Sequence, residues 1–174
     1  IDLIKKEVII NSERYKFDII INTISPDLLF EKCYGELKLL GREFHKIVFP
    51  TENVFPKNVY FLYYANDEKF TRLVEYKKFT HHKSKNSLVG MEIPTLEGGK
   101  HYPLPFKKDQ VLAQKYLNDF PKGVFSIGRA GSYLYGIDID DCIRQSMLMI
   151  EMIKQGGQDD SPVPGIEYRF PELN

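Results

Sequence analysis

The stretch Gly123-Val124-Phe125-Ser126-Ile127-Gly128-Arg129-Ala130-Gly131 decides the fold that we expect for this chain. It begins as a short apolar run, which predicts a buried strand, and the glycine-bearing turn at 128–131 follows directly. Residues 138–154 then carry apolar side chains at helical spacing. Aspartates crowd the start of this segment, where the helix dipole favours negative charge. A strand, a tight turn and a helix in this order predict one edge of an α/β layer.

We expect the helix over 138–154 to turn one apolar stripe toward the core. The stripe comprises Ile139, Ile143, Ser146 or Met147, Ile150 and Ile153. The glycine pair 156–157 should end the helix.

A hairpin is predicted near the start of the chain, with Glu7–Ile10 as its first arm and a turn at 11–14. Its second arm continues into a strand over 17–24. Three consecutive isoleucines run through that strand without polar alternation. We therefore expect both of its faces to be covered, as in a parallel sheet between two layers.

Between these pieces the pattern is that of an antiparallel sheet. Alternating segments separated by turn residues at hairpin spacing predict strands over 45–49, 58–64, 70–79 and 87–92. A helix over 107–120, ended by a proline, follows the sheet. A short helix over 27–33 precedes it, with Ser25-Pro26 at its start.

The order of elements predicts a mixed fold, α+β or α/β, in which an antiparallel sheet is inserted between two pieces of an α/β layer. We place a strand–helix piece at 1–34, the sheet at 35–106, a closing helix–strand–turn–helix at 107–157 and an irregular, proline-rich tail at 158–174. The chain begins at Ile1 and runs directly into strand-like sequence, so we expect it to be part of something longer.

Composition argues against several functions. Lys+Arg and Asp+Glu balance at 24 each, which gives no general attraction to nucleic acid or to an anionic membrane. No apolar run approaches the ~18 residues of a membrane span, and no set of metal ligands is readable. Cys33 and Cys142 are far apart in the sequence. We therefore expect a cytoplasmic protein in which each is a small buried residue.

Three features are candidates for a site, and each has two interpretations. The turn at 128–131 either meets the edge of a cofactor, with Arg129 as a fixed cation, or is a tight turn with a surface arginine. Arg72, in an apolar strand, either has an anionic partner or ligand or lies on an edge in solvent. Tyr102, held by Pro103, either hydrogen-bonds a sugar or phosphate or is a packed aromatic residue. The dinucleotide fingerprint Gly-x-Gly-x-x-Gly is absent from the chain.

Taken in order, these motifs resemble the C-terminal motifs of the UDP-galactopyranose mutases, which read T-R-x-x-E-x-K-x-F, Y-P, G-R-x-G-x-Y-x-Y and D-x-D. In this chain the corresponding stretches are Phe70-Thr71-Arg72-Leu73-Val74-Glu75-Tyr76-Lys77-Lys78-Phe79, Glu92, His101-Tyr102-Pro103, Gly128-Arg129-Ala130-Gly131-Ser132-Tyr133-Leu134-Tyr135 and Asp138-Ile139-Asp140. The resemblance extends over about 17–154.

The resemblance implies an isomerase that interconverts UDP-galactopyranose and UDP-galactofuranose for cell-surface polysaccharides. It implies FAD as the cofactor, active when reduced, with flavin N5 attacking the anomeric carbon as UDP leaves. The α/β pieces would then belong to an FAD-binding layer, and the sheet would bind the nucleotide sugar. The family's N-terminal dinucleotide fingerprint and its helical domain have no counterpart here. We therefore expect most of the FAD site to lie outside this chain and the chain alone to be inactive.

Site residues carry over by motif. Arg72 matches the catalytic arginine beside flavin and substrate, and Arg42 matches a further arginine that faces phosphate. Tyr102 and Tyr135 match tyrosines that hold the diphosphate. The resemblance assigns cofactor contacts to the segment that begins at the glycine turn, namely Gly128, Arg129, Tyr135, Gly136, Asp138 and Ile139. It implies a nucleotide-sugar partner, UDP-galactose, with neither nucleic acid nor membrane, and it leaves a homodimer open.

Two departures keep alternatives open. Gly136 and Ile137 both stand between Tyr135 and Asp138, where the family usually has one residue. Leu62 stands where the family commonly has an asparagine near the ligand. The alternatives are a mutase-like flavoprotein, an oxidoreductase of other specificity, and a non-enzymatic sheet domain used for binding.

Overall fold

The computed structural model describes residues 1–97, 101–156 and 162–164. The chain divides into two compact units. The first, the layer unit, comprises Ile1–Leu39 and Tyr102–Asn174. The second, the sheet unit, comprises Leu40–His101. The mixed α/β class and the antiparallel sheet are confirmed.

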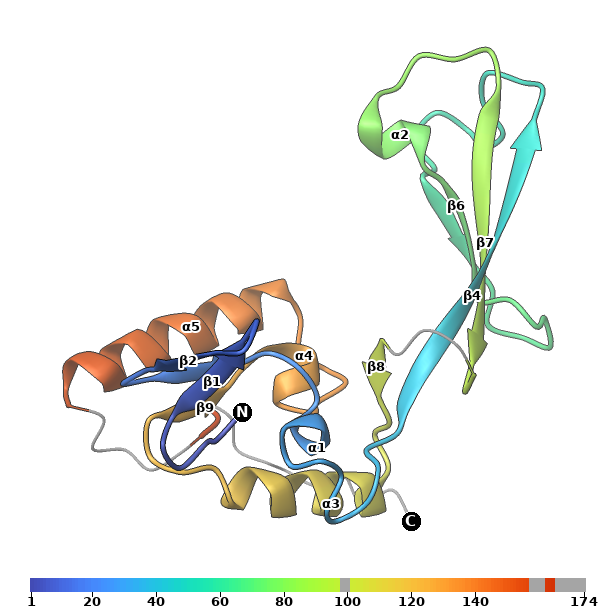
Figure 1. Ribbon diagram of the computed structural model, residues 1–174. Helices are drawn as coiled ribbons and strands as arrows, with labels where there is room; N and C mark the ends of the chain where they lie inside the picture. The colour runs from blue at the N-terminus through green and yellow to red at the C-terminus, as the bar shows by residue number, and fades with distance from the viewer. Residues whose placement is uncertain (98–100, 157–161, 165–174) are drawn as a thin grey trace. The chain divides into compact units, whose positions relative to one another are not determined.

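The layer unit carries most of the helices (Figure 1). Its elements are β1 (Glu7–Ile10), β2 (Glu13–Lys16), β3 (Ile20–Asn22), α1 (Pro26–Leu29), β8 (Tyr102–Pro103), α3 (Lys107–Asn118), β9 (Val124–Ser126), α4 (Gly128–Gly131) and α5 (Ile139–Lys154). Strands β1 and β2 form the predicted hairpin. Strands β3 and β9 pair in parallel, with Ile20 opposite Val124.

The parallel pair fixes the glycine turn through buried polar groups. The Asn22 amide donates to Ser126 Oγ at 2.7 Å, and that hydroxyl donates to the Gly131 carbonyl at 2.8 Å. A Cβ on Gly131 would lie 3.1 Å from both the Asn22 carbonyl and Ser126 Oγ. Glycine at 131 therefore lets α4 pack closely against both strands.

Helix α3 supplies the core of the layer unit. The core gathers Leu37, Ala113, Tyr116 and Tyr133. Because a buried phenol needs hydrogen-bond partners, Tyr116 donates to the Gly35 carbonyl at 2.7 Å and accepts the Tyr34 amide at 2.9 Å. The predicted helix over 107–120 is confirmed.

Helix α5 lies where the sequence predicts it, but its orientation differs from the expected one. A capping box of Asp138 and Asp141 begins the helix. The face that packs on the unit carries Gln145 and Met149, both buried. The expected inner stripe is therefore wrong: Ile139 is 81% exposed, and the stripe positions Ile143, Met147 and Ile150 are exposed as well.

Three other expectations for this unit need correction. Strand β3 is shorter than predicted, and Ile21 is 49% exposed, because within the described residues β3 pairs with β9 alone. The short helix ends at Leu29 rather than residue 33, since Glu31 and Lys32 take positive φ. Cys33 is exposed and Cys142 only half-buried.

The sheet unit is an antiparallel, strongly twisted sheet with strand order β5-β6-β7-β4 (Figure 1). Its strands are β4 (Leu39–Phe49), β5 (Phe61–Tyr63), β6 (Arg72–Glu75) and β7 (Ser87–Thr95), and a short helix α2 (Lys77–Thr80) follows β6. The long pair β4–β7 places Phe44 opposite Glu92. The shorter pair β6–β7 places Arg72 opposite the same glutamate.

The strand predicted over 70–79 stops at Glu75, so that prediction is wrong for its second half. The reason is a buried ion pair between Glu75 and Lys78, whose charged atoms lie 3.2 Å apart. Lys78 Nζ donates to the carbonyls of Phe55, Pro56 and Val59, and Glu75 accepts the amides of Val54 and Phe55. Turning the chain into α2 brings Lys78 beside Glu75, and the full set of partners offsets the desolvation of both charges.

The sheet unit lies within the segment 35–106 that was assigned to the sheet. The assignment of 1–34 and 107–157 to a flavin-binding layer stays a prediction. Most of the tail, 158–174, is outside the described residues. Within 162–164, the Pro162 carbonyl accepts the Ser126 amide at 2.7 Å, and Val163 is buried.

Candidate functional site

In the sheet unit two arginines converge on one carboxylate, Glu92. Arg72 Nη2 donates to both Glu92 oxygens at 2.8 Å, and Arg72 Nε donates at 3.1 Å. Arg42 Nη1 donates to Glu92 Oε2. The register of the strands explains the convergence. Arg72 on β6 lies directly opposite Glu92 on β7. On β4, which pairs with the other edge of β7, Phe44 lies opposite Glu92 and Arg42 is two residues away from Phe44. We call Arg42, Arg72 and Glu92 the arginine pair site.

The electrostatics of the arginine pair site favour an anion. The Glu92 side chain is 6% exposed, whereas the side chains of Arg42 and Arg72 are 31% and 26% exposed. Both guanidiniums donate to one buried carboxylate and stay partly exposed, so each presents positive charge at the surface. Burial alone would lower the pKa of Arg72, but hydrogen bonds to Glu92 and Tyr63 raise it overall. Arg72 is therefore held as a fixed cation.

Aromatic rings pack beside this site. Phe44 and Tyr76 pack edge to face, with centroids 5.7 Å apart. A Cβ at Gly90 would lie within 2.6 Å of both rings, so only glycine leaves room for them. Burial and the Glu92 charge raise the pKa of Tyr76, which keeps its phenol neutral.

Tyr63 is a residue that the sequence reasoning missed. It lies opposite Arg72 on the edge strand β5. Arg72 Nη1 donates to its hydroxyl at 3.3 Å, and the guanidinium carbon lies 5.7 Å from its ring centroid. The sequence held one signal for it, which is the pairing of the strands predicted at 58–64 and 70–79. A hairpin of these two strands places either Tyr63 or Tyr64 opposite Arg72.

In the layer unit a second group forms around Arg129. Its guanidinium lies 4.8 Å from the centroid of Tyr102, and that ring lies 5.7 Å from the ring of Tyr135. Arg129 Nε donates to the Ile137 carbonyl at 2.8 Å, and Arg129 Nη2 donates to Asp138 Oδ1 at 2.7 Å. Four of the predicted site residues, Tyr102, Arg129, Tyr135 and Asp138, are thus brought together. We call them the Arg129 site.

The chain builds this second group from the strand–turn–helix stretch. Strand β9 ends at Ser126, and Gly128 takes a φ of +78°, which only glycine adopts without strain. The Gly128 amide donates to Gln145 Oε1 at 2.8 Å, so this predicted cofactor contact has a partner within the chain. Gln145 also donates to Ser132 Oγ at 2.8 Å, which fixes the turn against α5.

The remaining predicted residues border the start of α5. A Cβ on Gly136 would meet no atom within 4 Å, so open space surrounds it. Ile139 is the first residue of α5, where helix geometry leaves the amides without helical partners. Asp138, Asp140 and Asp141 give this helix start a negative charge, which disfavours a phosphate there and suits a neutral ring edge.

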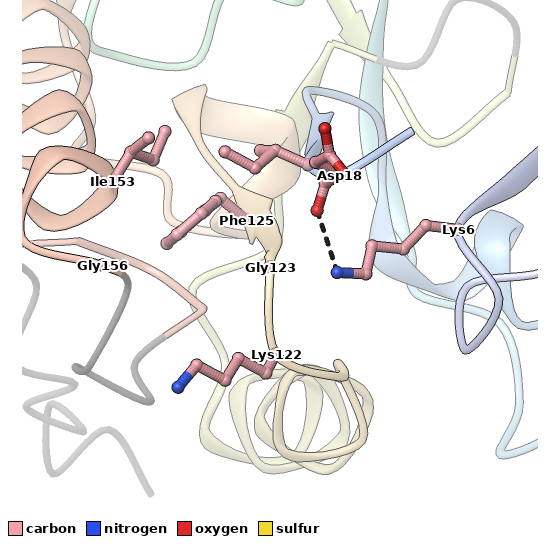
Figure 2. Close-up of a pocket in the computed structure, with 8 residues that line it drawn as sticks. Lys6, Asp18, Lys122, Gly123, Phe125, Ile153 and Gly156 are labelled. Carbon is pink, nitrogen blue, oxygen red and sulfur yellow. Dashed lines mark hydrogen bonds between the residues drawn. The ribbon is translucent and has the colours of Figure 1, made fainter. Parts of the chain in front are cut away.

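A separate hollow of about 390 Å³ lies beside the parallel strands β3 and β9, at the end away from the glycine turn (Figure 2). Ile19, Phe125 and Ile153 line it with apolar surface, and two lysines stand at its rim. One of them, Lys6, donates to the Asp18 carbonyl at 2.8 Å, as the dashed line in Figure 2 shows. The hollow lies at the amino ends of β3 and β9, whereas ligands of α/β sheets bind at the carboxyl ends. The hollow is therefore a weaker candidate for a ligand site than the Arg129 site.

Two features are absent from the described part of the chain. Over residues 1–97, 101–156 and 162–164, no cluster of three or more His, Cys, Asp or Glu side chains has a geometry suited to a metal ion. In the same ranges no helix has the length and hydropathy needed to cross a membrane.

Comparison with known proteins shows a family and a fold that this chain resembles. The family model described as UDP-galactopyranose mutase matches residues 3–135, a range that includes every predicted site residue except Gly136, Asp138 and Ile139. The chain is also similar to a solved structure described as a crystal structure of reduced UDP-galactopyranose mutase, with a TM-score of 0.70 and 16% identity. That likeness, which concerns the fold, covers 92% of this chain and 46% of the other. The chain thus spans about half the length of the solved relative. No curated protein matches it.

Proposed function

Because the chain belongs to the UDP-galactopyranose mutase family, we propose that it supplies diphosphate-binding and flavin-facing residues to an isomerase that interconverts UDP-galactopyranose and UDP-galactofuranose. The substrate class follows from the family and from the positive charge of the arginine pair site. In this proposal the whole activity requires a complete flavin site, of which this chain contributes one part.

The observation that carries the proposal is the arrangement of Arg42 and Arg72 on the buried Glu92. A single buried carboxylate orients both guanidiniums and leaves part of each exposed. Fixed cations of this kind suit a diphosphate, because guanidinium donors match phosphate oxygens in geometry and charge.

The Arg129 site fits the edge of a flavin ring better than a pyrophosphate. Arg129 offers a cation whose position is set by the Ile137 carbonyl and Asp138, and the rings of Tyr102 and Tyr135 offer flat apolar faces. The carboxylates at the start of α5 would repel phosphate groups. We propose that Arg129, Gly136 and the first amides of α5, at Ile139, border the flavin, with Asp138 holding Arg129 in place. We further propose that Tyr102 and Tyr135 hold the substrate diphosphate, as their matches to the family motifs imply.

When bound and reduced, FAD supplies the nucleophilic nitrogen N5 for attack on the anomeric carbon of the sugar. The residues of this chain act on the leaving group. As the bond from the anomeric carbon to UDP breaks, negative charge grows on the diphosphate, and Arg72 and Arg42 lie ready to stabilise it. Because Glu92 already orients both side chains, little reorganisation accompanies the step.

A mutase-like flavoprotein of other specificity is the second candidate. Leu62 favours it, because an exposed leucine stands in β5 where the family commonly has an asparagine. For either candidate we propose a cytoplasmic location, since both cysteines are free thiols. We also propose UDP-galactose as the partner molecule.

The experiment uses the full-length gene product, loaded with FAD and reduced with dithionite. UDP-galactopyranose is added, and the furanose product is separated by chromatography. The proposal predicts furanose from the reduced protein and none from the oxidised protein. A flavin-loaded, reduced protein that binds UDP but forms no furanose would favour the second candidate.

A further inference from the structure

The hydroxyl of Tyr63 occupies a position next to the arginine pair site that the family motifs do not assign. The side chain of Tyr63 is 68% exposed, the most exposed of the large apolar and aromatic residues of β5. Its oxygen accepts a hydrogen bond from Arg72 Nη1 at 3.3 Å. Since that contact uses a lone pair of the phenol, the O–H proton stays available to donate to another acceptor.

The position of Tyr63 is set by packing within the sheet unit. Strand β5 pairs with β6 so that Tyr63 and Arg72 lie directly opposite each other and share a face of the sheet. The ring of Phe61 contacts the ring of Tyr63 edge to face at 5.1 Å. Before the strand, Lys78 binds the carbonyls of Phe55, Pro56 and Val59 and so anchors the segment that leads into β5. The strand pairing, the Phe61 ring and the Lys78 hydrogen bonds together hold the phenol beside Arg72.

We propose that Tyr63 is a further diphosphate-binding residue, which donates its O–H to a phosphate oxygen that Arg72 also binds. The inference rests on the proposed function, since it adds a donor to the same site. Arg72 decides the acceptor, because its guanidinium is partly exposed and also donates to the phenol oxygen. Guanidinium donors match phosphate oxygens in geometry and charge, so a phosphate oxygen bound by Arg72 is the acceptor for the O–H.

The guanidinium also strengthens the donor. A cation that donates to the phenol oxygen withdraws electron density from it, so the O–H becomes a better hydrogen-bond donor. The ring itself contributes separately, through the contact of Arg72 with its face at 5.7 Å. Replacement of Tyr63 by phenylalanine removes the hydroxyl and keeps the ring, which separates the two roles.

The test compares Tyr63→Phe with the wild-type full-length gene product by calorimetric titration with UDP, with UDP-galactopyranose and with uridine. Tyr60→Phe is the matched control, because Tyr60 directly precedes the same strand and its ring packs against that of Phe79, with centroids 5.0 Å apart. Thermal unfolding of each variant checks that the sheet is intact. For Tyr63→Phe we expect UDP and UDP-galactopyranose to bind about tenfold more weakly, by equal factors, with uridine unchanged.

Equal losses for the two diphosphates, with the Tyr60→Phe control at wild-type affinity, support the proposal. Unchanged UDP affinity in Tyr63→Phe overturns it, and so does a loss confined to UDP-galactopyranose, which would assign the hydroxyl to the sugar. Either result leaves the proposed isomerase intact if the wild-type protein still forms the furanose. A wild-type protein that binds UDP tightly but forms no furanose defeats the proposed function alone.

Discussion

The two arginine sites of this chain are anchored in different ways. In the sheet unit, Glu92 is almost fully buried and holds two guanidiniums at once. In the layer unit, the Asp138 side chain is 75% exposed and holds Arg129 alone, with help from the Ile137 carbonyl. A buried carboxylate fixes its partners, because they cannot exchange it for water, whereas an exposed one competes with solvent. We infer that Arg72 is held more firmly than Arg129.

The largest effect is expected for Glu92→Gln. The change removes the carboxylate charge to which Arg42 and Arg72 both donate, and removing one partner of a buried ion pair costs about 3–5 kcal/mol. Urea unfolding of the purified protein should show a loss of at least about 2 kcal/mol, since the arginines are partly exposed. A Glu92→Gln variant as stable as the wild type would show that the glutamate anchors neither arginine.

The buried pair Glu75–Lys78 gives a second check on the buried side of the comparison. Burial alone would raise the pKa of Glu75, but hydrogen bonds from the Phe55 and Val54 amides and from Lys78 lower it from 4.5 to about 2. A lowered pKa stabilises the fold above pH 4.5, and the stabilisation is lost as the pH falls from 4.5 toward 2. We expect about 2 kcal/mol over that window.

The measurement compares the free energy of unfolding of the wild type and Glu75→Gln from pH 7 to pH 3. The difference between the two proteins should shrink as the pH falls. A difference that stays constant with pH would mean that the carboxylate charge of Glu75 contributes nothing.

An intermediate effect is expected for Gly90→Ala. A Cβ at residue 90 would overlap the rings of Phe44 and Tyr76, which pack beside the arginine pair site. Overpacking of this kind costs about 1–3 kcal/mol. Thermal denaturation should show a lower Tm, and Gly136→Ala is the control, because open space surrounds that residue. Equal Tm values for the two variants would contradict the crowding at Gly90.

The smallest effect on stability is expected for Asp138→Asn. An exposed ion pair contributes about 0–1 kcal/mol, and asparagine still caps the helix. Urea unfolding, as for Glu92→Gln, gives the loss in the free energy of unfolding of Asp138→Asn. Comparing this loss with that of Glu92→Gln shows how much more firmly the buried carboxylate is coupled than the exposed one. A loss as large as that of Glu92→Gln would show that Asp138 is as firmly coupled as the buried glutamate.

Local patterns in the sequence predicted most elements but not which faces are covered. The strand–turn–helix stretch and helix α3 follow from spacing and caps, which are local properties. The apolar stripe of α5 was assigned to the core because helical periodicity identifies an apolar face without saying what lies against it. In the described chain the packed face holds Gln145, whose amide binds Gly128 and Ser132, and no spacing rule anticipates a buried glutamine.

The candidate sites divide in the same way. Tyr102, Arg129 and Tyr135 were identified by motif, and they do contact one another. The link between Arg42 and Arg72 through Glu92 was not anticipated. It depends on the register of three strands, and Arg42 and Glu92 are 50 residues apart in the sequence, beyond the range of local patterns. Tyr63 was missed for the same reason, since its role follows from the residue opposite it.

The most direct test of the account is UDP binding to the full-length gene product with Arg72 replaced by glutamine. The account holds that the arginine pair site binds the diphosphate, so Arg72→Gln should bind UDP at least about 50-fold more weakly by calorimetric titration, with uridine binding unchanged. UDP affinity within about twofold of the wild type, in a variant that folds normally, would contradict it.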